Sequence, residues 1–114
     1  MELITIDKKD SIANALKIIN ENNFSQIPVT SEDRIVGSIY ENLVYNHILK
    51  SANAKDDKVE LIMQEALPFA DITTPLEELS EMISGDRMAV LVKDFKAGRT
   101  YIITKSEIAE ALIK

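Results

Sequence analysis

The stretch FSQIPVTSEDRIVGSIY, residues 24–40, decides the fold of this chain. Residues 26–30 and 35–40 are rich in β-branched side chains, and the intervening Ser-Glu-Asp segment contains residues that are common in turns. We therefore predict a β-hairpin over residues 26–40.

Amphipathic segments flank the hairpin on both sides. Asp10 is a plausible N-cap for a first helix that ends near residues 22–23, and a second helix is predicted over residues 41–50. The apolar residues of the first helix recur at i, i+3, i+4 and i+7, and are Ile12, Ala15, Leu16 and Ile19. This spacing predicts helices that pack one face against the hairpin.

The chain repeats this order of elements. A shift of 64 positions aligns Ile12 with Leu76 and Ile39 with Ile103, and a shift of 61 places residues 27–29 on 88–90. The helix of the second copy is predicted to begin with a capping box at Thr74-Pro75-Leu76-Glu77 and to stop at Ser84-Gly85. Residues 88–92 predict a strand covered on both faces, and residues 96–98 a turn.

These patterns predict an α+β protein of two tandem helix-strand-strand-helix repeats that pack through their small sheets. We assign residues 1–52 to the first repeat, 53–58 to a polar linker and 59–114 to the second repeat. A short helix carrying Val59, Ile62, Met63 and Ala66 is expected to open the second repeat. Each repeat alone, at about 55 residues, is too small to bury a generous core.

Composition excludes several classes of function. The chain has 13 Lys and Arg against 19 Asp and Glu, a net charge of −6, which disfavours nucleic-acid binding. It has no cysteine, one histidine and three glycines, which leaves little equipment for metal binding, phosphate cradling or catalysis. We found no apolar run of membrane-spanning length and no signal peptide, so we expect a cytoplasmic protein that is not an enzyme.

The order of these motifs resembles a tandem pair of CBS domains, the regulatory module named after cystathionine beta-synthase. The resemblance rests on residues 24–29 and 35–39, and on Tyr101-Ile102-Ile103-Thr104-Lys105-Ser106-Glu107. Residues 68–105 are similar to the C-terminal regulatory region of bacterial cystathionine beta-synthases. That likeness implies an attached or partner enzyme, with no pyridoxal phosphate and no other resident cofactor in this chain.

The resemblance also implies a ligand site, for an adenosyl compound in the cleft between the repeats. The ligand residues that it implies are Ile4, Thr5, Phe24, Gln26, Ile27, Pro28, Thr104, Lys105 and Glu107. Glu107 would hold the ribose hydroxyls, although the family usually has Asp there. The equivalent positions of the first repeat hold Tyr40 and Leu43, so we expect one competent pocket at most.

Simpler interpretations stand beside each of these residues. Thr104 and Glu107 form a capping box with or without a ligand, Phe24 suits a core, and Gln26 suits a solvent-facing strand position. His47 reads as an ordinary helical side chain, and residues 55–58 as a solvated loop.

The ligand and the assembly have alternatives as well. S-adenosylmethionine, with its sulfonium cation, suits an acidic protein, whereas AMP or ATP would need local cations such as Lys105, Arg87 or Lys93. Family analogy implies a homodimer formed through the helices, and the alternative function is a dimerisation scaffold without a physiological ligand.

Overall fold

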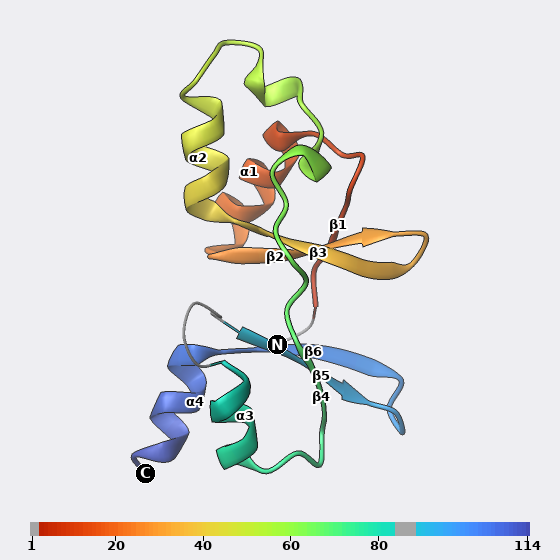
Figure 1. The fold of residues 1–114 in the computed structure, drawn as a ribbon, viewed down its shortest axis with the longest axis vertical. Coiled ribbons are helices and arrows are strands. Elements are labelled where there is room, and N and C mark those ends of the chain that lie inside the picture. The colour runs from red at the N-terminus through yellow and green to blue at the C-terminus, as the bar shows by residue number, and fades with distance from the viewer. Residues whose placement is uncertain (1–2, 84–88) are drawn as a thin grey trace. The chain divides into compact units, whose positions relative to one another are not determined.

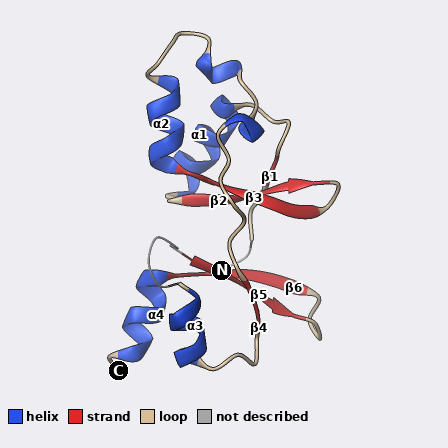
Figure 2. Ribbon diagram, in the orientation of Figure 1, coloured by secondary structure: helices blue, strands red, loops and turns tan. Residues whose placement is uncertain are grey.

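The computed structural model describes residues 3–83 and 89–114. Contacts divide the chain into two units: Ile4–Ala66, and Leu67–Lys114 together with the residues up to Leu3. Each unit carries one three-stranded sheet and two α-helices, as Figure 1 shows by element label and Figure 2 by type of structure. The predicted α+β class and the two similar sets of elements are confirmed. The predicted Ser84-Gly85 helix stop, Arg87 and Met88 lie outside the described residues.

The first unit contains the predicted hairpin. Strand β2 (Gln26–Ser31) pairs antiparallel with β3 (Arg34–Tyr40) and parallel with the short β1 (Ile6–Asp7). Helices α1 (Ile12–Asn22) and α2 (Glu41–Ile48) lie on one face of this sheet (Figure 1).

Residues with a left-handed backbone mark the ends of these elements. Glu32 and Asp33, between β2 and β3, have φ of 50° and 65°, as the two central residues of a tight hairpin turn require. Asn23, with φ of 57°, ends α1, and its N–H donates to the Ile19 carbonyl. Both predicted boundaries are confirmed.

The N-cap of α1 is Ser11, so the prediction of Asp10 is wrong by one residue. The Ser11 Oγ accepts the Asn14 N–H at 3.1 Å. Asp10 instead accepts the Ser11 N–H at 2.7 Å and the Asn14 side-chain amide at 2.7 Å. Two neighbouring side chains compete for the same helix start, and only the backbone conformation decides which of them caps it.

The core of the first unit lies between the helices and one face of the sheet. Because side chains alternate along a strand, Ile27 and Val29 face the helices, while Gln26 and Pro28 lie on the opposite face. The buried members of this core are Ile6, Ile12, Ala15, Ile19, Ile27, Val29, Ile39, Val44 and Val59.

Residues 53–66 belong to the first unit. The sequence had instead predicted a linker over residues 53–58 and the start of the second repeat at residue 59. The Ile12 N–H donates to the Asp57 carbonyl at 2.9 Å, and the Val59 N–H donates to the Asp10 carbonyl at 2.8 Å. The segment forms two short 3₁₀ turns, Ala54–Asp56 and Val59–Leu61. The apolar spacing from Val59 therefore serves the first core, and the boundary between the units falls after residue 66.

The second unit repeats the same topology. Strand β5 (Ala89–Asp94) lies between β4 (Phe69–Asp71), which is parallel to it, and β6 (Arg99–Thr104), which is antiparallel. Helices α3 (Leu76–Met82) and α4 (Lys105–Leu112) cover one face. The buried core residues are Leu79, Ile83, Val90, Val92 and Ile108. Within β5, residues 89–92 are all buried, as the apolar run predicted.

The strand registers correct the alignment of the repeats. Gln26 pairs with Tyr40, and Ala89 pairs with Thr104, so Gln26 corresponds to Ala89, a shift of 63 rather than 61. The core positions Ile27 and Val29 then correspond to Val90 and Val92. A run in which every residue is apolar has no period, and therefore does not reveal its register.

The predicted capping box at Thr74 is also wrong. The N-cap of α3 is Pro75, which makes no side-chain cap hydrogen bond, and the helix begins at Leu76. The Thr74 Oγ1 accepts the Asp71 N–H at 3.2 Å instead, which closes the turn after β4.

Among the described residues, none of the helices has the length and the apolar character that a membrane span requires.

Candidate functional site

The junction of β6 and α4 brings together the predicted ribose-binding residues. Thr104 is the N-cap of α4, and its Oγ1 accepts the Glu107 N–H at 3.3 Å. The Glu107 Oε1 in turn accepts the Thr104 N–H and the Thr104 hydroxyl, each at 3.1 Å. The capping box that the sequence predicted here is confirmed.

This capping box holds the Glu107 carboxylate in one orientation at the start of the helix. Two of the three hydrogen bonds use the carboxylate, both through Oε1, and Oε2 lies outside the box. Glu107 is exposed, and Lys105 next to Thr104 is partly buried. The junction therefore presents a positioned carboxylate oxygen and the N-terminus of a helix at one place.

The corresponding junction of the first unit lacks this chemistry. Tyr40 is the N-cap of α2 and makes no side-chain cap hydrogen bond, and Leu43 stands where Glu107 stands in α4. An aliphatic side chain offers no acceptor to a diol. The expectation of one competent pocket at most stays a prediction.

The first-unit candidates lie on and beside β2. Gln26, for which a solvent-facing position was the simpler interpretation, is only 7% exposed. Across the ladder, Pro28 pairs with Ser38, which is fully buried and whose Oγ has no hydrogen-bond partner among the described residues. Gln26, Pro28 and Ser38 share the sheet face that the core does not use, so this face carries buried hydrogen-bonding groups.

The remaining candidates are divided between core and surface. Phe24 packs against the core of its unit, as the simpler interpretation had it, and the Ile27 side chain is part of that core. A contact between the peptide groups around Ile27 and a ligand stays a prediction. Ile4 and Thr5 are exposed and lead into β1. These residues and the Thr104–Glu107 group belong to different units, and a site shared between them stays a prediction.

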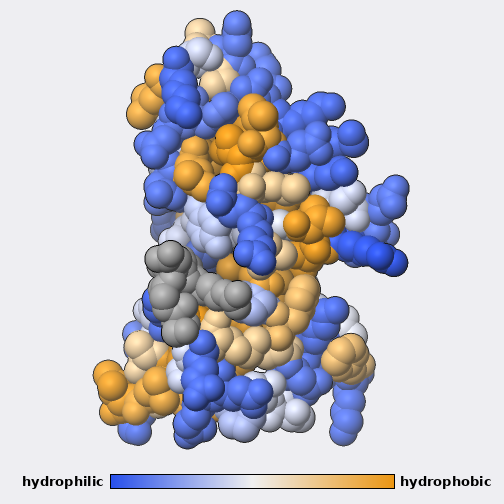
Figure 3. Space-filling view, viewed as in Figure 1, coloured by the Kyte–Doolittle hydropathy of each residue, from blue (hydrophilic) through white to orange (hydrophobic). Residues whose placement is uncertain are grey.

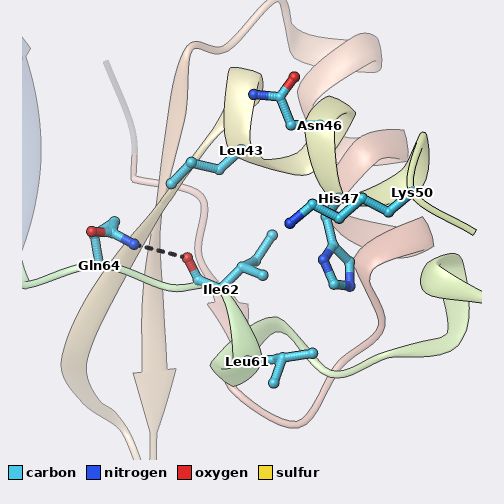
Figure 4. Close-up of a pocket in the computed structure, with 7 residues that line it drawn as sticks. All are labelled: Leu43, Asn46, His47, Lys50, Leu61, Ile62 and Gln64. Atoms are coloured by element: carbon cyan, nitrogen blue, oxygen red, sulfur yellow. Dashed lines mark hydrogen bonds between the residues drawn. The ribbon is translucent and has the colours of Figure 1, made fainter.

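The first unit contains a pocket that the sequence did not suggest. It has a volume of about 550 Å³ and lies between α2 and the segment 59–64, as Figure 4 shows. Its lining residues are Leu43, Asn46, His47, Lys50, Leu61, Ile62 and Gln64. No local pattern points to it, because the segment 59–64 appeared to belong to the second repeat.

His47 beside this pocket has a partner that the sequence did not suggest. Its Nε2 lies 2.8 Å from the Asp57 Oδ2, and the His47 side chain is 14% exposed. This contact joins α2 to the loop that follows it. Within the described residues, no group of three or more His, Cys, Asp or Glu side chains forms a candidate metal site.

Part of the chain is similar to a known protein family. Residues 1–49 match the family model of the CBS domain. A comparison with curated proteins found no match.

Solved structures resemble the chain over nearly all its length. A hemolysin-like protein containing a CBS domain, from Oenococcus oeni, is 23% identical with a TM-score of 0.79, and the match covers 98% of this chain and 82% of that one. A putative signal-transduction protein with CBS domains, from Burkholderia ambifaria, is 21% identical with a TM-score of 0.79, over 97% and 82% of the two chains. A putative archaeal homologue of gamma-AMPK, from Methanocaldococcus jannaschii, is 21% identical with a TM-score of 0.77. The match covers 97% of this chain and 44% of that one.

Proposed function

We propose that this chain, which has the fold of a tandem CBS-domain pair, is a regulatory module that senses an adenosyl compound. It would modulate the activity of an attached or partner enzyme, for which we propose cystathionine beta-synthase. The observation that carries the ligand proposal is the Glu107 carboxylate, which the capping box orients through Oε1 while Oε2 stays outside the box.

A ribose diol suits this carboxylate. Its two hydroxyls are donors, and hydrogen bonds to an ionised carboxylate are stronger than those between neutral groups. Because the capping box already restrains Glu107, little side-chain entropy remains to be lost on binding. We propose that Gln26 and the peptide groups around Ile27 and Pro28 supply polar contacts to the adenine, with Phe24 behind them. Ile4 and Thr5 would close over the base.

The charge of the protein favours S-adenosylmethionine over adenine nucleotides. The net charge is −6, and the sulfonium group of S-adenosylmethionine is a cation. The phosphates of AMP or ATP would instead have to use the N-terminus of α4 beside Lys105.

Calorimetry and thermal unfolding with S-adenosylmethionine, S-adenosylhomocysteine, AMP, ADP and ATP test the proposal. A ligand present at 100 times its Kd should stabilise the protein by about 2.7 kcal/mol. Glu107→Ala should weaken binding by tenfold or more, because a hydrogen bond to a charged group is worth about 1.5–3 kcal/mol.

Two further variants separate ligand binding from helix capping. Glu107→Gln keeps an acceptor for the capping box but removes the charge, so it should bind weakly while it folds normally. Glu110→Ala changes an exposed carboxylate on the same helix and should leave binding unchanged. Equal affinity of the wild type and Glu107→Ala would refute the ribose assignment.

Exposed apolar side chains favour a second candidate function, a dimerisation scaffold. Leu112 and Ile113 at the end of α4 are 49% and 86% exposed, and Leu49 after α2 is 82% exposed. If none of the five ligands binds and light scattering gives twice the monomer mass of 12.8 kDa, this function replaces the first.

A further inference from the structure

We propose that the pocket between α2 and the segment 59–64 binds a small carboxylate that carries a short aliphatic chain. All seven lining residues belong to the unit Ile4–Ala66, so this site is separate from the adenosyl site and does not depend on it. Its volume of about 550 Å³ lies in the range typical of small-molecule sites.

The charges of the lining point to an anion. The chain has 19 acidic residues, yet none of them lines this pocket, and Lys50 is the lining residue with a permanent charge. Figure 4 shows the Lys50 side chain extended over the pocket, with its ammonium pointing toward Leu43 and Ile62. Among the described residues, no carboxylate lies within ion-pair distance of this ammonium. A carboxylate in the pocket would supply the missing partner.

Two of the polar side chains around Lys50, those of His47 and Gln64, have defined orientations. The His47 ring is held by its 2.8 Å contact with Asp57, which lies outside the lining. The Gln64 side-chain amide donates to the Ile62 carbonyl at 3.3 Å (Figure 4). Asn46 on α2 adds a second amide with two donors.

The apolar part of the lining points to an aliphatic chain. Leu43, Leu61 and Ile62 form this part, and Leu61 is 64% exposed. In Figure 3 the surface between α2 and the segment 59–64 is hydrophobic. A short alkyl chain would cover this surface and remove it from water.

The walls of the pocket are formed before any ligand arrives. Gln64 makes two backbone hydrogen bonds with Ser38, and Val59 is fully buried in the core, so both ends of the segment 59–64 are anchored. A preformed wall reduces the ordering cost of binding.

Two lining residues of this pocket have no chemically similar counterpart in the second repeat. The shift of 64 places Glu107 and Ala111 of α4 on Leu43 and His47 of α2. The fold common to both repeats therefore does not require a lining of this composition.

Titration of the ¹⁵N-labelled protein with hexanoate tests the proposal. We expect saturable shifts confined to the amides of residues 43–50 and 59–64, with a Kd near 1 mM, a value typical of a weak ligand. Lys50→Gln should weaken binding about fivefold, as expected for one solvent-accessible ion pair. Lys55→Gln, an exposed lysine of the same unit outside the pocket, should leave the Kd unchanged.

Uncharged and cationic analogues complete the test. Hexanol and hexylammonium should bind at least fivefold more weakly than hexanoate. Equal binding of hexanol, an unchanged Kd in Lys50→Gln, or no saturable shift in these segments would each overturn the proposal. Amide spectra of each variant report its folding, so a folding defect is recognised separately from a loss of binding.

Discussion

Replacement of Gly37 by alanine should weaken the packing of residues 59–66 against the rest of the first unit. Gly37 lies in β3, where an added Cβ would stand 2.8 Å from the Gln64 carbonyl oxygen and 2.9 Å from the Met63 Sδ. The flexible Met63 side chain can move away, but the Gln64 carbonyl belongs to the backbone and cannot move alone.

The expected loss of stability follows from the bonds that this movement breaks. The Ser38 N–H donates to the Gln64 carbonyl at 3.0 Å, and the Gln64 N–H donates to the Ser38 carbonyl at 2.7 Å. Each backbone hydrogen bond contributes about 0.5–1.5 kcal/mol net, so Gly37→Ala should lower the free energy of unfolding by about 1–3 kcal/mol.

Urea unfolding measures the loss of stability, and amide hydrogen exchange measures the loss of the hydrogen bonds between Ser38 and Gln64. The urea midpoint should fall, and the amides of Ser38 and Gln64 should exchange faster than in the wild type.

Ser38→Ala is the matched control. The Ser38 Oγ is buried without a partner among the described residues, so loss of the hydroxyl should be neutral or slightly stabilising. If Gly37→Ala has the wild-type urea midpoint and unchanged protection at Ser38 and Gln64, the close approach described here is refuted.

Three other substitutions test separate features. Val59→Ala should cost about 2 kcal/mol in urea unfolding, because the side chain is fully buried in the first core; a change near zero would exclude Val59 from that core. Glu107→Ala should lower the free energy of unfolding by about 1 kcal/mol, because it removes the capping box of α4. Glu77→Ala, on a helix without a capping box, should change this free energy by only about 0.3 kcal/mol. Equal effects of the two variants would contradict the assignment of the caps. The backbone N–H of Thr73, and then its hydroxyl, donate to Asp71 and hold the pKa of that carboxyl below its ordinary 3.8; Thr73→Val should raise this pKa in an NMR titration, and an unmoved pKa would refute the role of the hydroxyl. Because the pKa of Asp71 is lowered in the folded state, its contribution to stability is present above pH 3.8 and is lost as the pH falls through the lowered value.

Local sequence patterns predicted most of the secondary structure. The hairpin over β2 and β3, the end of α1 at Asn23 and the capping box of α4 depend on neighbouring residues alone. Such features involve contacts within a few positions, and their residue types carry the signal.

The errors arose where several local choices were equally good. Asp10 and Ser11 both suit an N-cap, and Thr74 suits either a cap or the turn after β4. The apolar run of β5 fits more than one register, and its pairing with Thr104 selects the one that occurs. At the two helix starts the alternatives differ in hydrogen bonds between residues at most three positions apart, whereas the register of β5 depends on its pairing with a separate strand.

The candidate sites also differ in whether the sequence or the tertiary structure reveals them. The sequence by itself determined the duplicated α+β plan and the Thr104–Glu107 pair, because the signals lie within short stretches of the chain. Only the tertiary structure decided that Val59 belongs to the first core, that Asp57 meets His47 and that Lys50 extends over a pocket. The physical reason is that these contacts depend on how residues 53–66 fold back on the first unit, and the deciding hydrogen bonds at Asp10, Ile12 and Ser38 join residues far apart in the chain.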